Sequence, residues 1–223
     1  FIWLTASWRL ALFCVLAMFF VGVFDLWSIA MFTLAAVLVS VILCFLIGVP
    51  LGILAACSDG FESFLKPILD AMQTMPAFVY LIPVLMFFGG NVVSAVIATV
   101  IYALPPMIRL TNLGIRQVPA SAVEAADSFG STSFQTMIKV KIPLAVPSMM
   151  MGLNQSVMMG LAMAVITPLI GGGGLGQEVF TALARVNTGM GLEAGLSIVI
   201  LAVVMDRITQ AWSVKQRAAL GIE

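Results

Sequence analysis

Several apolar runs in this chain are long enough to cross a membrane, and their length limits the fold more than any other feature. A spanning helix needs about 20 mostly apolar residues, and residues 29–56 form a longer run without one charged side chain. Hydrophobic residues make up 62% of the chain and charged residues 9%, whereas a soluble domain is nearer half apolar and a quarter charged. The sequence therefore predicts an all-α integral membrane protein.

Six spanning segments are expected within a single domain over residues 1–223. They are predicted at about residues 4–23, 29–56, 75–88, 92–113, 144–170 and 190–205, with a short amphipathic helix at 175–186. An interfacial segment at residues 61–73 leads into the third span. Its Glu62, Lys66 and Asp70 share one helix face, and their i,i+4 spacing predicts mild mutual support.

Prolines and glycines mark two of these spans. Pro105 and Pro106 are expected to interrupt the fourth, because a proline removes a helical hydrogen bond. In the second, Gly48 and Gly52 form a small-x-x-x-small pattern, which lets helices approach closely in membranes. The alternative is a helix adjusted around Pro50 that has no special partner.

The composition argues against several classes of function. The net charge is zero, so nothing suggests nucleic acid as a partner. Histidine is absent from the sequence, which argues against proton shuttling and against Ser-His-Asp or zinc-protease chemistry. Cys14, Cys44 and Cys57 are far apart, so burial as small hydrophobic residues is preferred over a metal site. We expect no metal and no catalytic residue, and the start at Phe1 predicts that an N-terminal portion is missing.

The basic residues predict the orientation, because cytoplasmic loops carry an excess of Lys and Arg. With six spans, one side receives nine basic residues and the other only Arg185. The nine are Arg9, Lys66, Arg109, Arg116, Lys139, Lys141, Arg207, Lys215 and Arg217. Both ends of the sequence and the polar interval at residues 119–143 are therefore expected in the cytoplasm, and the glycine loop at about 171–176 on the outer side.

Residues 119–143 form the longest polar interval, which cannot stay in lipid. Ser121 and Glu124 match a capping box, in which the serine caps a helix start and the glutamate reaches back. The helix that they predict covers residues 122–129 and ends at Gly130, the preferred type of residue just after a helix.

A second capping box, at Thr132 and Gln135, predicts another helix that runs to Pro143. Two capped helices joined at a glycine make a shaped object rather than a flexible connector. These residues alone also fit a merely rigid connector between two spans.

The same interval resembles the EAA signature of ABC importer permeases. Glu124-Ala125-Ala126 is followed by three residues, a glycine, nine residues and then Val140-Lys141-Ile142-Pro143, where the family pattern ends in I-x-L-P. In that family this loop is a coupling helix that docks in a groove of a cytoplasmic ATPase subunit. The resemblance implies a docking face made of Ser121, Glu124, Ala125, Ala126, Gly130 and Pro143.

The resemblance covers nearly the whole chain and is to the permease subunits of glycine betaine and proline betaine importers. It rests on DAMQTMPAFVY (70–80), YALPPMIRLT (102–111), GLNQ (152–155), GGLGQ (173–177) and residues 200–207. It implies a type I ABC importer transmembrane domain with about six spans and a coupling helix, in the bacterial plasma (inner) membrane.

The resemblance also implies the partners and the mechanism. Two copies of the chain would pair with two ATPase subunits, and an extracytoplasmic substrate-binding protein would deliver the solute. ATP-driven closure of the ATPase dimer would move the coupling helices, and the permease would alternate its access between the two sides. ATP and magnesium would bind the ATPase partner and not this chain, which has no P-loop motif.

Two groups of side chains are candidates for lining the solute pathway, one in the third span and one in the fifth. Aromatic faces attract quaternary ammonium groups, and methionine offers a soft, adaptable wall. The candidates are Met72, Met75, Phe78, Tyr80, Asn154, Gln155 and Met158, of which Asn154 and Met158 share a helix face. Ordinary helix packing with interhelical amide hydrogen bonds explains each of them at least as well.

Pro76, Gly171, Gly172, Gly173 and Gly174 are candidates for bends near the outer gate. Four consecutive glycines are poorly suited to a helix, and no lysine follows them as it does in a phosphate-binding loop. A backbone bend is therefore the preferred interpretation.

Three other functions stay open at this stage. An importer of the same class could carry choline, carnitine or proline. A channel or secondary transporter that works without ATP would need ionisable residues at mid-membrane, and the spans show few. An intramembrane enzyme would need paired carboxylates at depth, which are absent from the spans.

Overall fold

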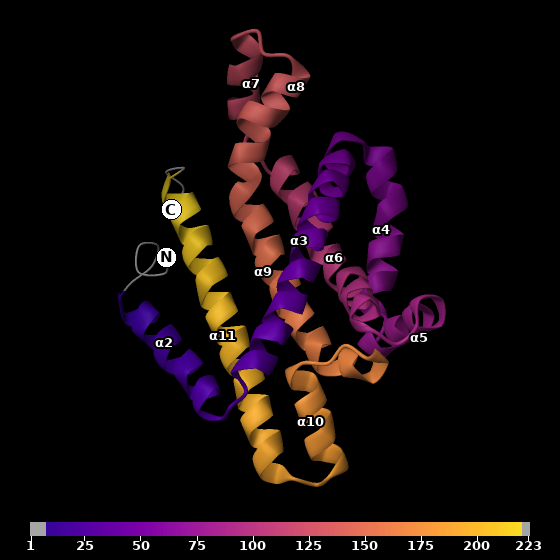
Figure 1. The fold of residues 1–223 in the computed structure, drawn as a ribbon. Helices are drawn as coiled ribbons and strands as arrows, with labels where there is room; N and C mark the ends of the chain where they lie inside the picture. The colour runs from indigo at the N-terminus through magenta and orange to yellow at the C-terminus, as the bar shows by residue number, and fades with distance from the viewer. Residues whose placement is uncertain (1–7, 220–223) are drawn as a thin grey trace.

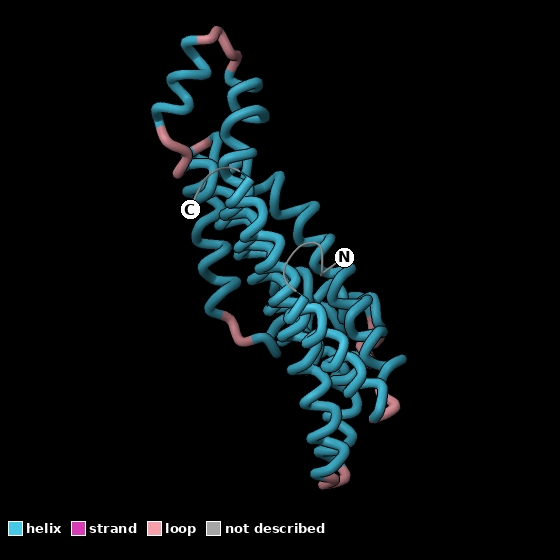
Figure 2. The backbone as a smooth tube through the Cα atoms, turned by 90° about the vertical axis from the view of Figure 1, so that its left-hand side faces the viewer, coloured by secondary structure: helices cyan, strands magenta, loops and turns pink. Residues whose placement is uncertain are grey.

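The computed structural model describes residues 8–219 of the chain, all of them in helices or short connections. The helices are α2 (Trp8–Val23), α3 (Trp27–Cys57), α4 (Asp59–Thr74), α5 (Ala77–Phe88), α6 (Val92–Arg116), α7 (Ala120–Ser128), α8 (Ser133–Thr136), the π-helix η1 (Met137–Lys141), α9 (Ile142–Ile166), the 3₁₀-helix η2 (Thr167–Ile170), α10 (Leu175–Ala184) and α11 (Thr188–Ala219). The molecule is elongated, with α7 and α8 at one end and the α10–α11 turn at the other (Figures 1 and 2).

Four helical segments are long and apolar enough to cross a membrane, and the bent pair α4–α5 adds a fifth if it counts as one span. The four are Trp27–Cys57, Val92–Arg116, Ser133–Ile170 and Thr188–Trp212. The apolar part of α2, Ala11–Val23, is shorter, and the beginning of the predicted first span lies outside the described residues. The prediction of an all-α membrane protein is confirmed, and the predicted interfacial segment and third span correspond to the bent pair α4–α5.

The third span is broken rather than continuous. The chain bends by 102° between α4 and α5, with Met75 in an extended conformation and Pro76 directly before α5. The residue before a proline is pushed out of the helical region, and this ends α4. At 12 residues, α5 is only ~18 Å long, too short to cross a hydrocarbon core of about 30 Å.

The fourth span shows the opposite departure, because Pro105 and Pro106 lie inside a helix that continues to Arg116. Both prolines are buried. Donors from neighbouring helices reach the carbonyls around them: Cys44 Sγ donates to Val100 O and Ser156 Oγ to Ala103 O. The helix continues through both prolines, so the predicted interruption is wrong.

Helices α3, α6 and α9 pack together as the centre of the bundle. The glycine pattern in α3 has a specific partner there. A Cβ atom at Gly52 would lie 2.5 Å from Thr111 Cβ, and one at Gly48 would lie 2.8 Å from Met107 Cγ. Real Cβ contacts are longer, so these two glycines allow the close approach of α3 to α6, as in other small-x-x-x-small helix pairs.

The cysteines divide into two environments. Cys14 and Cys44 are buried, as expected of small hydrophobic residues, whereas Cys57 is exposed. Cys57 is the last residue of α3 and precedes the Ser58 cap of α4, so it has left the packed part of the bundle.

Thr111→Val is expected to raise the stability of the protein by about 1 kcal/mol. Thr111 is fully buried at the α3–α6 crossing, and its hydroxyl has no hydrogen-bond partner among the described residues. Valine keeps the shape and removes the unpaired hydroxyl. Thermal unfolding in detergent measures the change. The matched control is Thr99→Val, since Thr99 donates to Ala95 O and its loss should lower stability. Equal loss in both variants would contradict this account of Thr111.

Candidate functional site

Helices α7 and α8 project beyond the bundle as a hairpin-like tip (Figures 1 and 2). We define the tip as residues 120–136. Gly130 has φ 76°, and it ends α7 with two hydrogen bonds: Gly130 N donates to Asp127 O and Ser131 N to Ala126 O. This pair is the Schellman arrangement, which favours glycine because the residue must be left-handed. The predicted turn at Gly130 is confirmed.

The start of α7 differs from the predicted capping box. Pro119 precedes the helix, and its carbonyl accepts from Ala122 N and Val123 N. The helix therefore begins at Ala120, two residues earlier than expected, and Ser121 is already inside its first turn. The Ser121 side chain makes no capping hydrogen bond to this helix, so its capping role is wrong, while its place on a docking face stays a prediction.

The second predicted capping box is present at α8. Thr132 Oγ1 accepts from Gln135 N at 3.3 Å, and Thr132 N donates to Gln135 Oε1 at 2.9 Å. Thr136 Oγ1 also donates to Asp127 Oδ1 across the two tip helices at 3.4 Å. The Thr136–Asp127 bond and the Gly130 turn connect α7 to α8, so the tip is a shaped element.

No break separates the tip from the following span. Helix α8 continues through η1 into α9, and Pro143 is the second residue of α9 rather than a stop. A single π turn, η1, lies directly before α9, and the helix continues through Pro143. The predicted helix end at Pro143 is therefore wrong, and α8, η1, α9 and η2 form one segment from Ser133 to Ile170.

Exposed side chains cover the tip. Glu124 and Ala125 are exposed and Ala126 is half-buried. Two aromatic residues that sequence reasoning missed are far more exposed, Phe129 at 91% and Phe134 at 73%. The sequence feature that could have identified them is an aromatic residue on each side of the Gly130 turn, within an interval that is otherwise polar.

The predicted glycine bend lies at the far end of the Ser133–Ile170 segment, where it packs closely. Gly171, Gly173 and Gly174 have positive φ. A Cβ atom at Gly171 would lie 2.9 Å from the carbonyl carbon of Gly90, and one at Gly174 would lie 2.5 Å from Thr33 Oγ1. Thr33 Oγ1 also accepts from Leu175 N at 2.8 Å. The loop therefore connects α9 to α3 and to the α5–α6 turn.

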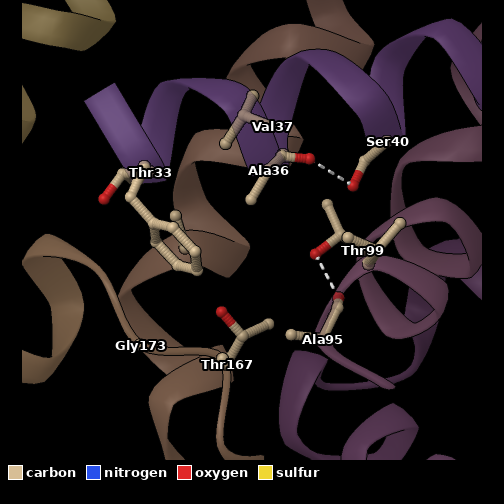
Figure 3. Close-up of a pocket in the computed structure, with 13 residues that line it drawn as sticks. Thr33, Ala36, Val37, Ser40, Ala95, Thr99, Thr167 and Gly173 are labelled. Atoms are coloured by element: carbon tan, nitrogen blue, oxygen red, sulfur yellow. Dashed lines mark hydrogen bonds between the residues drawn. The ribbon is translucent and has the colours of Figure 1, made fainter. Parts of the chain in front are cut away.

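A small cavity, lined in part by hydroxyl groups, borders this loop (Figure 3). The hydroxyl-bearing residues Thr33, Ser40, Thr99 and Thr167 lie around it together with Phe32. Its volume of about 20 Å³ is enough for one water molecule and far below the 300 Å³ or more of typical ligand pockets. Within residues 8–219, no group of three or more His, Cys, Asp or Glu side chains could hold a metal ion.

Comparison with known proteins identifies the family. Residues 48–216 match the family described as binding-protein-dependent transport system inner membrane component. This chain belongs to that family. The expectation of a non-catalytic transport permease agrees with it.

Two named relatives cover most of this permease. The glycine betaine/carnitine transport permease protein GbuB of Listeria monocytogenes serotype 1/2a (strain 10403S) is 50% identical over 212 residues, covering 95% of this chain and 75% of GbuB. The glycine betaine/proline betaine transport system permease protein ProW of Escherichia coli (strain K12) is 50% identical over 191 residues, covering 86% of this chain and 54% of ProW. The permease thus spans about half the length of ProW.

The fold has a solved counterpart in an inward-facing MetNI methionine ABC transporter. The TM-score is 0.74 at 22% identity, and the match covers 83% of this permease and 95% of that chain. The predicted fold, a type I ABC importer transmembrane domain, and the predicted family are confirmed.

The first group of predicted pathway residues surrounds the α4–α5 bend of the permease. Met75 and Phe78 are exposed and Met72 is half-buried. Tyr80 is buried; its hydroxyl donates to Met72 O, and its ring meets Tyr102 edge-on at 5.8 Å between centroids. Tyr80 thus stabilises the bend that Pro76 introduces, and its role in a pathway stays a prediction.

The second group lies on α9. Gln155 and Met158 are exposed. Asn154 bridges to α11, because its Nδ2 donates to Asp206 Oδ1 at 3.1 Å and its Oδ1 accepts from Thr209 Oγ1. These bonds give Asn154 a helix-packing role, and no residue of either predicted group borders the cavity in Figure 3.

The charged residues of α4 form ion pairs with residues of α6 rather than with one another. Arg116 forms ion pairs with Asp59 at 2.7 Å and Glu62 at 2.9 Å, and Arg109 pairs with Asp70. The predicted intrahelical support is therefore replaced by contacts between the two helices. The missed signal was that Arg109 and Arg116 are seven residues apart, which places them on one face of α6.

The predicted orientation stays a prediction, and the arrangement of charges is compatible with it. Lys139 and Lys141 lie beside the tip, and Arg185 lies at the opposite α10–α11 end (Figure 1). The side chains of Arg9, Lys215 and Arg217 are outside the described residues.

Proposed function

We propose that this chain is the permease subunit of an ATP-driven importer for glycine betaine or a closely related compatible solute. The observation that carries the proposal is the 50% identity over 95% of the chain to a permease named for glycine betaine and carnitine transport. Ionisable side chains are energetically costly in lipid and usually mark ion or proton pathways. Spans with few such side chains are therefore compatible with a zwitterionic solute, which carries no net charge.

The geometry of the tip supports the proposed coupling to a separate ATPase. The tip is exposed, rigidly capped and continuous with a spanning segment, so a force applied to α7 and α8 is transmitted to η2 without a hinge at Pro143. Energy enters through contacts that differ between two states of the transporter. ATP and magnesium belong to the ATPase subunits in this scheme, and this chain binds neither.

We place the solute pathway between two copies of the permease. The cavity in Figure 3 is too small for a betaine, whereas α5 carries strongly exposed apolar side chains, including Met86 and Phe87. An extracytoplasmic binding protein would deliver the solute to the end where the glycine loop and the α10–α11 turn lie, and alternating access would release it on the tip side, in the cytoplasm.

Vesicles that contain the permease, its ATPase and its binding protein test the proposal. Labelled glycine betaine should accumulate only with ATP, and unlabelled choline, carnitine and proline in excess rank the alternatives. Uptake without ATP would contradict the importer and favour a channel or secondary transporter. Conversion of the solute without uptake would favour an enzyme.

Phe129→Asp is expected to lower uptake at least tenfold without destabilising the permease. Phe129 is 91% exposed and contributes little to the packing of this chain, while an aromatic anchor buried in a partner commonly contributes 2 kcal/mol or more to binding. ATP-dependent uptake and thermal unfolding are measured together. Phe129→Leu is the matched control and should retain most of the uptake. If Phe129→Asp transported normally, Phe129 would not be a docking residue.

A further inference from the structure

A second and larger cavity lies between α4 and α6, away from the glycine loop. Its volume is about 240 Å³, several times the ~30 Å³ that one water occupies in the liquid. Three cationic side chains border it, Lys66, Arg109 and Arg116, together with one carboxylate, Glu62. Basic side chains therefore outnumber acidic ones among the residues that line the cavity.

The cavity retains donors that the ion pairs of α4 and α6 do not use. Arg116 is fully engaged on its Nε and Nη2 atoms with Asn112, Ala55 O and two carboxylates. Arg109 uses only Nη2, toward Asp70. The Lys66 ammonium is exposed and has no acceptor among the described residues. Donors from Lys66 and Arg109 are free to bind an added anion.

The remaining walls of the cavity are apolar. Leu65, Leu69, Ile108 and Leu113 complete them, and Phe64 on α4 is 66% exposed beside this helix pair. The cavity lies where α6 passes from its apolar stretch to its charged end at Arg109 and Arg116. A site at that level combines basic donors with an apolar surface for hydrocarbon.

We propose that the α4–α6 cavity binds the phosphate headgroup of an anionic phospholipid, with its acyl chains against the apolar wall. Basic pockets between membrane helices on the cytoplasmic side bind anionic headgroups, and the predicted orientation has Lys66 and Arg109 on that side. A free phosphate ion shares the charge but leaves the apolar wall uncovered, so the geometry favours the lipid.

Native mass spectrometry of the assembled transporter, taken from nanodiscs with equal phosphatidylglycerol and phosphatidylcholine, tests the site. Selective retention of phosphatidylglycerol is expected. Lys66→Gln should reduce it about fivefold, since one basic side chain at an anionic membrane surface contributes about that factor. The pair Arg109→Gln with Asp70→Asn should reduce it similarly without leaving a carboxylate unpaired. Lys139→Gln, an exposed lysine outside the cavity, is the matched control and should change nothing.

Three results would overturn the proposal. The first is equal retention of both lipids by the unchanged protein. The second is unchanged phosphatidylglycerol retention in both cavity variants, with folding verified by thermal unfolding. The third is loss of the bound lipid on adding millimolar inorganic phosphate at constant ionic strength, which would assign the cavity to a free anion.

Discussion

Gly130→Pro abolishes ATP-dependent uptake while leaving the permease in the membrane: this is the largest functional effect that we expect. Gly130 adopts φ 76°, and proline is fixed near −65°. The substitution also removes the amide that donates to Asp127 O. Both hydrogen bonds that end α7 would be lost, and α7 would no longer meet α8 at the angle that we assign to ATPase docking.

Uptake into vesicles and solute-stimulated ATP hydrolysis both measure this effect. We expect a loss of more than tenfold in each, with normal amounts of permease in the membrane, because a Cβ atom at Gly130 meets nothing within 4 Å. Gly130→Asn is the matched control, since asparagine tolerates the left-handed region, and it should retain most activity. Normal coupling in Gly130→Pro would exclude the tip as the docking element.

Glu124→Lys tests the same docking face through charge rather than backbone. Glu124 is exposed, and its carboxylate has no partner among the described residues, so the change should not disturb the fold. Solute-stimulated ATP hydrolysis should fall to the level seen without solute. Glu124→Gln keeps the shape and serves as its control; full coupling in Glu124→Lys would remove Glu124 from the docking face.

Gly176→Ala is expected to have the largest effect on stability, a loss of about 3 kcal/mol. A Cβ atom at Gly176 would lie 2.2 Å from the backbone oxygen of Ala164 and 3.0 Å from Val165 Cα. Backbone atoms cannot move aside as side chains do, so α10 would have to shift away from α9.

Thermal unfolding in detergent measures this loss. The matched control is Gly195→Ala in α11, where an added Cβ atom meets nothing within 4 Å. Alanine is favoured over glycine inside a helix by roughly 1 kcal/mol, so Gly195→Ala should be neutral or stabilising. A similar loss in both variants would show that helical glycines are needed for reasons other than close packing.

Features that depend on neighbours in the sequence were predictable. The Gly130 turn and the Thr132 capping box each involve at most six consecutive residues, and both are present. Ser121 shows the limit of such reasoning, because a serine capping box and a proline cap two residues earlier are both compatible with the same local sequence. Only the hydrogen bonds to Pro119 O distinguish them.

Features that depend on distant partners were not predictable from local patterns. The charges of α4 were identified, but their partners Arg109 and Arg116 lie on another helix, and a sequence does not place α4 beside α6. Asn154 was chosen for its polarity inside an apolar span. The structure adds its bonds to Asp206 and Thr209, which lie more than 50 positions away in the chain.

The unbroken segment from Ser133 to Ile170 also acts as a lever. Its 38 residues correspond to ~57 Å at 1.5 Å per residue, nearly twice the ~30 Å hydrocarbon thickness of a bilayer. A tilt of ~5° about the tip end would displace Ile170 by ~5 Å, a full helical turn. The glycine loop that packs on α3 and on the α5–α6 turn begins at the next residue. A small rotation at the tip, where the ATPase is proposed to bind, would therefore move the start of the glycine loop by ~5 Å at the opposite end of the segment.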